Sequence, residues 1–134
     1  MGELSERAAE YVGGPAWEPL RDKYFKICDK FLAMDANSKG ELTTIYVKLS
    51  VFMNGGEQVF AVIWLRSSKQ LLVGMALPET TTSRLLTAAP KGCTYKGLTK
   101  YLTIFPDDPL PLELDIWAKQ SYENVVNRTT ERPA

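Results

Sequence analysis

Histidine is absent from the 134-residue chain, and this absence excludes a large share of enzyme chemistry. Without imidazole there is no serine–histidine or cysteine–histidine nucleophile pair and no histidine ligand for zinc or iron. Cysteine is scarce as well: Cys28 and Cys93 stand far apart, outside any CxxC pair, which argues against a disulfide framework. We therefore expect a protein that is not an enzyme, with no catalytic residue, no metal and no cofactor.

An excess of charge of one sign is also missing, because 16 basic and 16 acidic side chains cancel to a formal net charge of zero. A surface built mainly to neutralise nucleic-acid phosphates would be basic overall. The cancellation is not uniform along the chain, since the segment 80–106 contains basic residues and no acidic one. One hypothesis is that these basic residues form an anion- or nucleic-acid-binding site. The competing interpretation is an ordinary solvated surface. The basic residues are Arg84, Lys91, Lys96 and Lys100.

Long apolar runs are missing too. The longest, Val59–Leu65, is far shorter than the ~20 residues that span a bilayer. The charged N-terminus lacks the apolar region of a signal peptide, so we expect a cytoplasmic protein without membrane association. The length and the hydrophobic content of 45% predict a single domain over 1–134, with its core at about 17–126. Residues 1–14 are expected to form a short helix or arm, and residues 127–134 a polar tail.

The spacing of apolar residues predicts two long helices around a sheet. A stripe at three- and four-residue spacing predicts a helix over 17–34, and a second helix is predicted over 109–126, with Asp107 or Asp108 as its N-cap. Strands are predicted at 41–52, 58–66, 70–77 and 98–105, with a hairpin turn at Asn54-Gly55-Gly56 and a short helical turn near 80–86. The predicted fold class is therefore α+β: two layers, with an antiparallel sheet of four or more strands and both helices on one face.

Two of the predicted strands are apolar on both faces, in the runs Val59–Leu65 and Leu71–Leu77. The helices cover one face; the other is covered by this chain, with help from 1–14 and 80–92, or by something outside it. In the second case the face binds a small apolar ligand or a second copy of the chain. The residues expected there are Phe60, Val62, Trp64, Leu72 and Met75. Gly74, beside bulky neighbours, indicates a hollow.

Three segments of the chain resemble a known family. They are Gln58–Lys69 leading into Leu71–Leu77, Tyr95–Ile104, and Leu112–Tyr122. Together they resemble the small bacterial domain of unknown function 5655, often labelled "predicted transport protein", over about residues 17–126. The late strand in that family often begins with histidine, which this chain lacks near Lys96 and Lys100. Because the family has no established activity, the resemblance implies a fold and a bacterial setting but no function.

Two other families suggest alternative functions. The helix–sheet–helix layout is similar to that of frataxin-like iron chaperones, but their iron binding uses an acidic first helix, whereas Lys23, Lys26 and Lys30 balance the charge here. The segment Gln120–Val126 resembles the last helix of double-wing DNA-binding proteins. Our first hypothesis is a binding or interaction module, with a small apolar ligand or a homodimer partner on the apolar face. Nucleic-acid or anion binding is the second, an enzyme that uses carboxylates or Cys93 is the third, and a metal chaperone is disfavoured.

Overall fold

The computed structural model describes the backbone of residues 1–131 and the side chains of residues 1–127. In chain order the elements are β1 (Glu3–Leu4), α1 (Glu6–Glu10), the 3-10 helix η1 (Pro15–Trp17), α2 (Glu18–Leu32), β2 (Lys39–Leu42), β3 (Tyr46–Met53), β4 (Gly56–Ser67), β5 (Gln70–Met75), β6 (Leu86–Thr87), β7 (Lys100–Ile104) and α3 (Leu114–Glu131).

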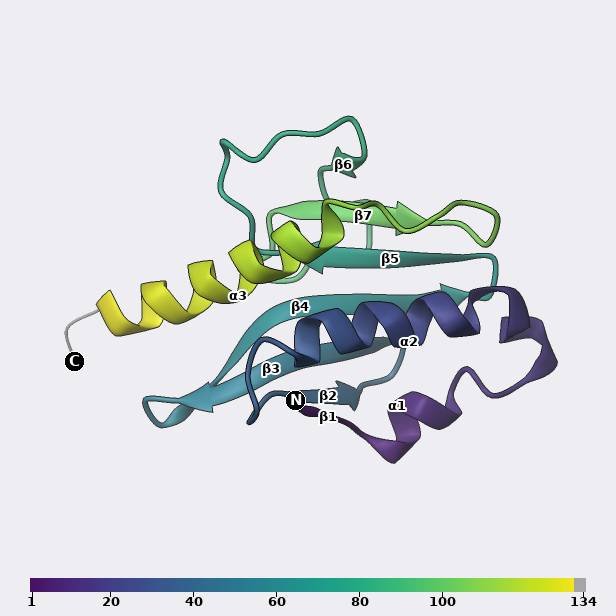
Figure 1. The fold of residues 1–134 in the computed structure, drawn as a ribbon, viewed down its shortest axis with the longest axis horizontal. Coiled ribbons are helices and arrows are strands. Elements are labelled where there is room, and N and C mark those ends of the chain that lie inside the picture. Colours follow the sequence, from purple (N-terminus) through teal and green to yellow (C-terminus); the bar gives the residue numbers. More distant parts are fainter. Residues whose placement is uncertain (132–134) are drawn as a thin grey trace.

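The strands form one seven-stranded sheet in the order β1-β2-β3-β4-β5-β7-β6. Neighbouring strands are antiparallel except β1, which pairs in parallel with β2. The two long helices, α2 and α3, lie across the same face of the sheet and contact each other (Figure 1). The predicted α+β class, with an N-terminal and a C-terminal helix on one face of a mostly antiparallel sheet, is thus confirmed.

The main core lies between these helices and the sheet. Of the stripe predicted for the 17–34 helix, four residues are fully buried in α2 and the first, Trp17, is half-buried in η1. The helix α3 contributes a matching set of side chains because apolar residues recur at helical spacing. The buried residues include Leu20, Tyr24, Ile27 and Phe31 from α2 and Leu114, Trp117 and Ala118 from α3. Residues 1–14 also belong to this core and are not a loose arm: β1 joins the sheet, and Ala8 and Val12 are 0% exposed.

The hairpin between β3 and β4 follows the predicted chemistry, because Asn54 (φ 53°) and Gly55 (φ 79°) both adopt the left-handed conformation of a tight two-residue turn. The single strand predicted at 41–52 is wrong, since the chain turns between β2 and β3. Thr43 makes that turn by donating its backbone N–H (2.7 Å) and its hydroxyl (3.2 Å) to the carbonyl of Tyr46. Such local side-chain bonds compete with strand pairing.

Both predicted limits of the last helix are also wrong. The helix begins only at Leu114, because the residues before Pro109 and Pro111 avoid the helical conformation and so delay its start. Asp107 and Asp108 therefore lie too far before the helix to cap it. It runs to Glu131, through part of the predicted polar tail, and residues 132–134 lie outside the described residues. The helical turn predicted near 80–86 is absent, and β6 lies there after a series of turns.

A β-bulge in β4 decides which apolar side chains face the helices. Leu49 pairs with Ala61 but Ser50 pairs with Val59, which leaves Phe60 as the extra residue. The carbonyl of Phe60 accepts a hydrogen bond from the Ser121 hydroxyl of α3. Its ring lies 6.2 Å from that of Phe31 and 5.4 Å from that of Tyr122, centroid to centroid, so Phe60 packs against the helices.

Candidate ligand-binding site

The face of the sheet opposite the helices is defined by the strand register. In one row across the strands, Trp64 of β4 lies between Tyr46 of β3 and Leu72 of β5. Leu72 in turn pairs with Thr103 of β7. One step along the strands, the same face presents Lys48, Val62, Gly74 and Tyr101 in a second row. We call this surface the second face.

The chain itself covers much of the second face. Residues 90–98, which we call the cover segment, pack onto it: the Tyr95 ring lies 5.9 Å from that of Tyr46, and the Tyr95 N–H donates to the Tyr101 hydroxyl (3.2 Å). As a result Val62, Trp64 and Leu72 are only 0%, 3% and 7% exposed. The second face is therefore not the open apolar surface that the sequence left possible.

The predicted apolar site is divided between the two faces. Phe60 is turned to the helices by the bulge, and Met75, opposite Ala61, lies on the helix side by strand alternation; both are 0% exposed. The predicted hollow at Gly74 is also wrong. A Cβ atom there would lie 2.8 Å from Cε2 of Tyr101 and 3.1 Å from Cδ1 of Leu98, because those side chains fill the space.

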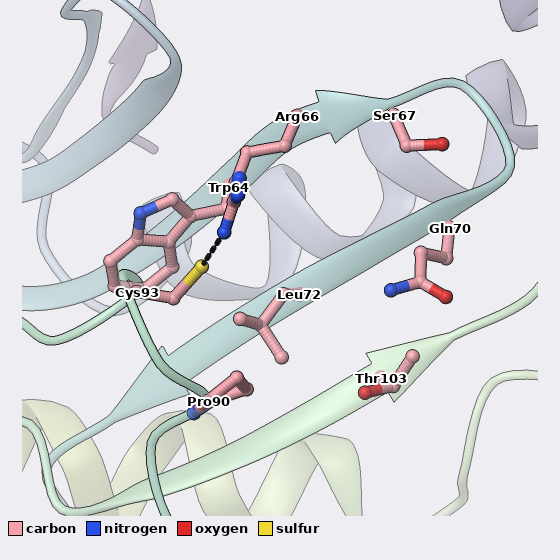
Figure 2. Close-up of a pocket in the computed structure, with 8 residues that line it drawn as sticks. All are labelled: Trp64, Arg66, Ser67, Gln70, Leu72, Pro90, Cys93 and Thr103. Atoms are coloured by element: carbon pink, nitrogen blue, oxygen red, sulfur yellow. Dashed lines mark hydrogen bonds between the residues drawn. The ribbon is translucent and has the colours of Figure 1, made fainter.

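Beside the cover segment, a pocket of about 400 Å³ opens on the second face. Its walls come from β4, β5 and β7 and from the start of the cover segment (Figure 2). The lining residues are Trp64, Arg66, Ser67, Gln70, Leu72, Pro90, Cys93 and Thr103. Trp64 and Leu72, two members of the predicted apolar site, thus line this pocket.

Sequence reasoning missed the polar half of this pocket. Arg66 and Ser67 lie two and three residues after Trp64, at the expected end of the strand, so strand position was a usable signal for them. Thr103 required the register between β5 and β7, and Cys93 required the path of the cover segment. Neither can be read from local patterns.

Arg66 dominates the electrostatics of the pocket. Its Nη1 donates to Sγ of Cys93 at 3.0 Å, the contact drawn in Figure 2, and a thiol is a weak acceptor. Among the described side chains no carboxylate forms an ion pair with Arg66, and none lines the pocket. The guanidinium therefore keeps most of its donors for solvent or a ligand.

Two tyrosine hydroxyls and one ion pair, Lys48 with Glu57 at 2.9 Å, also lie on this face. Burial raises the pKa of Tyr95 and of Tyr101, so both hydroxyls stay protonated at neutral pH. Elsewhere, burial raises the pKa of the Cys28 thiol to about 12, which fits a core side chain of α2 with no reactive role.

The basic residues of 80–106 do not all lie on one side of the sheet. Arg84, Lys91 and Lys96 are exposed, whereas the ammonium of Lys100 donates to the carbonyls of Glu79 and Thr81. Lys100 pairs with Met75 and so extends from the side of β7 opposite to Tyr101. Lys91 is close to the pocket, since a Cβ on its neighbour Gly92 would lie 3.7 Å from Nη1 of Arg66.

Among the side chains that the structure describes, those of residues 1–127, no group of three or more histidine, cysteine, aspartate or glutamate residues is placed to hold a metal ion. None of the helices in this part of the chain combines the length and the apolar character needed to cross a membrane. Comparison of the chain with protein-family models, curated proteins and solved structures finds no match. The resemblance to the bacterial family therefore stays a prediction.

Proposed function

We propose that the protein is a non-catalytic binding module and that the pocket beside the cover segment is its ligand site. The main support is the pocket's composition: Trp64 and Leu72 form an apolar floor, and Arg66, Ser67, Gln70 and Thr103 form a polar rim. A volume of about 400 Å³ lies within the range of small-molecule sites, which combine an apolar lining with a few polar groups.

The lining favours binding over catalysis. It contains no carboxylate and no imidazole, the groups that most often transfer protons at neutral pH. A cytoplasmic and bacterial setting belongs to the same proposal, and it is supported by the free thiols of Cys28 and Cys93 and by the family resemblance.

A homodimer through the second face has less support than a ligand. The apolar side chains that would form such an interface, Val62, Trp64 and Leu72, lie beneath the cover segment or at the bottom of the pocket. A stable interface needs an extended surface of its own, whereas a small ligand needs the pocket alone.

The proposal is tested by screening small neutral and charged fragments at millimolar concentration against ¹⁵N-labelled protein. We expect some fragments to shift the backbone amide signals of Arg66, Leu72 and Cys93, which surround the pocket. Thr103→Tyr, which places a ring in the pocket from a strand position, should abolish these shifts. Thr82→Tyr, at an exposed threonine outside the lining, serves as the matched control and should leave them intact.

Two results would overturn the proposal. One is the absence of any shift at the pocket across the whole screen. The other is a set of shifts that Thr103→Tyr leaves unchanged, because the fragments would then bind elsewhere.

A further inference from the structure

The charge of the pocket is unbalanced, and this imbalance specifies its ligand. We infer that the pocket binds a small organic monocarboxylate, with its carboxylate paired to Arg66 and a flat apolar part packed against Trp64 and Leu72. The inference rests on the proposed function and adds the chemical class of the ligand.

The first support is the state of the guanidinium. An arginine has five N–H donors in a planar fork that matches the two oxygens of a carboxylate. In the described part of the chain Arg66 donates a hydrogen bond to Cys93 and forms no ion pair. A ligand carboxylate would supply the strong acceptor that the protein does not place there.

The second support is the set of other donors on the rim. The hydroxyl oxygen of Ser67 accepts from the N–H of Lys69 at 3.0 Å, which leaves its proton free to donate outward. The side chains of Gln70 and Thr103 make no hydrogen bond within the part of the chain that the structure describes, and both line the pocket. These groups can solvate a carboxylate from the side opposite Arg66 without adding negative charge.

The third support is the rigidity of the apolar floor. The Trp64 ring is held between Tyr46 and Tyr101, each with its ring centroid 5.7 Å away. A floor held in place in this way loses little conformational entropy when a flat group packs on it. The single guanidinium favours a monoanion, because a phosphate dianion is usually bound by several cations or by a row of backbone N–H groups.

The test compares 2-naphthoate with 2-naphthamide, which have the same ring and nearly the same shape but differ in charge. We expect 2-naphthoate to bind about tenfold or more tightly than 2-naphthamide, since a charge-assisted hydrogen bond is roughly twice as strong as a neutral one. Arg66→Gln should remove this preference, mainly by weakening the binding of 2-naphthoate. Arg84→Gln changes the net charge equally at an exposed site outside the lining, and should preserve the preference. The amide spectrum of each variant verifies its fold.

The possible outcomes separate the two proposals. Equal binding of both probes at the pocket, or a preference that survives Arg66→Gln, overturns the monocarboxylate and leaves the binding module intact. Displacement of 2-naphthoate by equimolar inorganic phosphate also overturns it. If neither probe binds and the fragment screen shows no shift at the pocket, the proposed function fails as well.

Discussion

Gly74 lies where three buried side chains converge on the second face. A Cβ at this position would lie 2.8 Å from Tyr101 Cε2 and 3.1 Å from both Leu98 Cδ1 and Trp64 Cζ3. We expect Gly74→Ala to reduce the free energy of unfolding by about 1–3 kcal/mol, because ring atoms in a packed layer cannot move aside without strain. Urea-induced unfolding followed by circular dichroism measures this change.

Gly56→Ala is the matched control for this substitution. Gly56 is also a strand residue, the first of β4. The nearest atom to its added Cβ would be Nε2 of Gln58 at 3.8 Å, an ordinary contact. We expect a change within about 0.5 kcal/mol there. Equal effects at the two positions would contradict the close packing described around Gly74.

The turn glycine Gly55 and the packed glycine Gly74 differ in how well the sequence predicts their surroundings. The turn at Asn54 and Gly55 follows from adjacent residues, because both tolerate positive φ. Gly74 was predicted to leave a hollow, and that was wrong because Leu98 and Tyr101 come from a later part of the chain. Local chemistry predicts a turn, whereas the space around a side chain depends on partners that are distant in sequence.

At the scale of elements, α3 is tied to the loop after α2 by one strong hydrogen bond. The Tyr122 hydroxyl donates to Oδ2 of Asp35 at 2.6 Å. This bond, followed by one from the N–H of Asn37, holds the pKa of Asp35 below its usual value. The same bond, the largest cause, raises the pKa of Tyr122 to about 12.

These shifts predict how stability depends on pH. A carboxyl group whose pKa is lower in the folded protein stabilises the fold above its unfolded value of about 3.9, and this contribution is lost as the pH falls through the folded value. We therefore expect Tyr122→Phe to lose less stability than the wild type between about pH 6 and about pH 2.5. Chemical denaturation at a series of pH values measures the slope.

Tyr11→Phe is the control for this loss of stability at acid pH. The Tyr11 hydroxyl donates to the carbonyl of Leu65 at 3.5 Å, and a carbonyl does not titrate. Its slope should match the wild type. A slope for Tyr122→Phe equal to the wild type would show that the bond to Asp35 does not contribute to acid unfolding.

The predictability of each element follows from how local its determinants are. The stripe of α2 was predicted because four buried residues recur at helical spacing within one segment. The bulge at Phe60 was not, because a bulge is a property of the pairing between β3 and β4, and the unbroken apolar run Val59–Leu65 has no alternation that could reveal it. It moved one residue of the predicted site to the other face.

At the scale of the whole molecule, the sheet has a different kind of cover on each face. Two long helices pack on one side, and an irregular segment packs on the other. The sequence left open whether the second face was covered by the chain, since the contacts that decide it join distant residues. Arg66 with Cys93 and Tyr46 with Tyr95 are two of these.

The two covers should differ in local stability. Backbone hydrogen bonds within the cover segment close short turns, such as Cys93 N–H to the Pro90 carbonyl (3.0 Å) and Leu98 N–H to the Tyr95 carbonyl (3.1 Å). The central strands β4 and β5 are instead paired on both sides, and Ile63 and Val73 are 0% exposed. Opening the cover segment breaks few backbone bonds, whereas exposing the central strands requires global unfolding.

Native-state hydrogen exchange measures this difference directly. We expect the amides of residues 91–96 to exchange at least about a hundredfold faster than those of Ile63 and Val73, because only local opening is needed. Exchange at Cys93 as slow as at Ile63 would contradict this and make the cover part of the global folding unit. A ligand bound in the pocket should slow exchange at Cys93 while leaving Ile63 unchanged, since it stabilises the closed cover without altering the sheet.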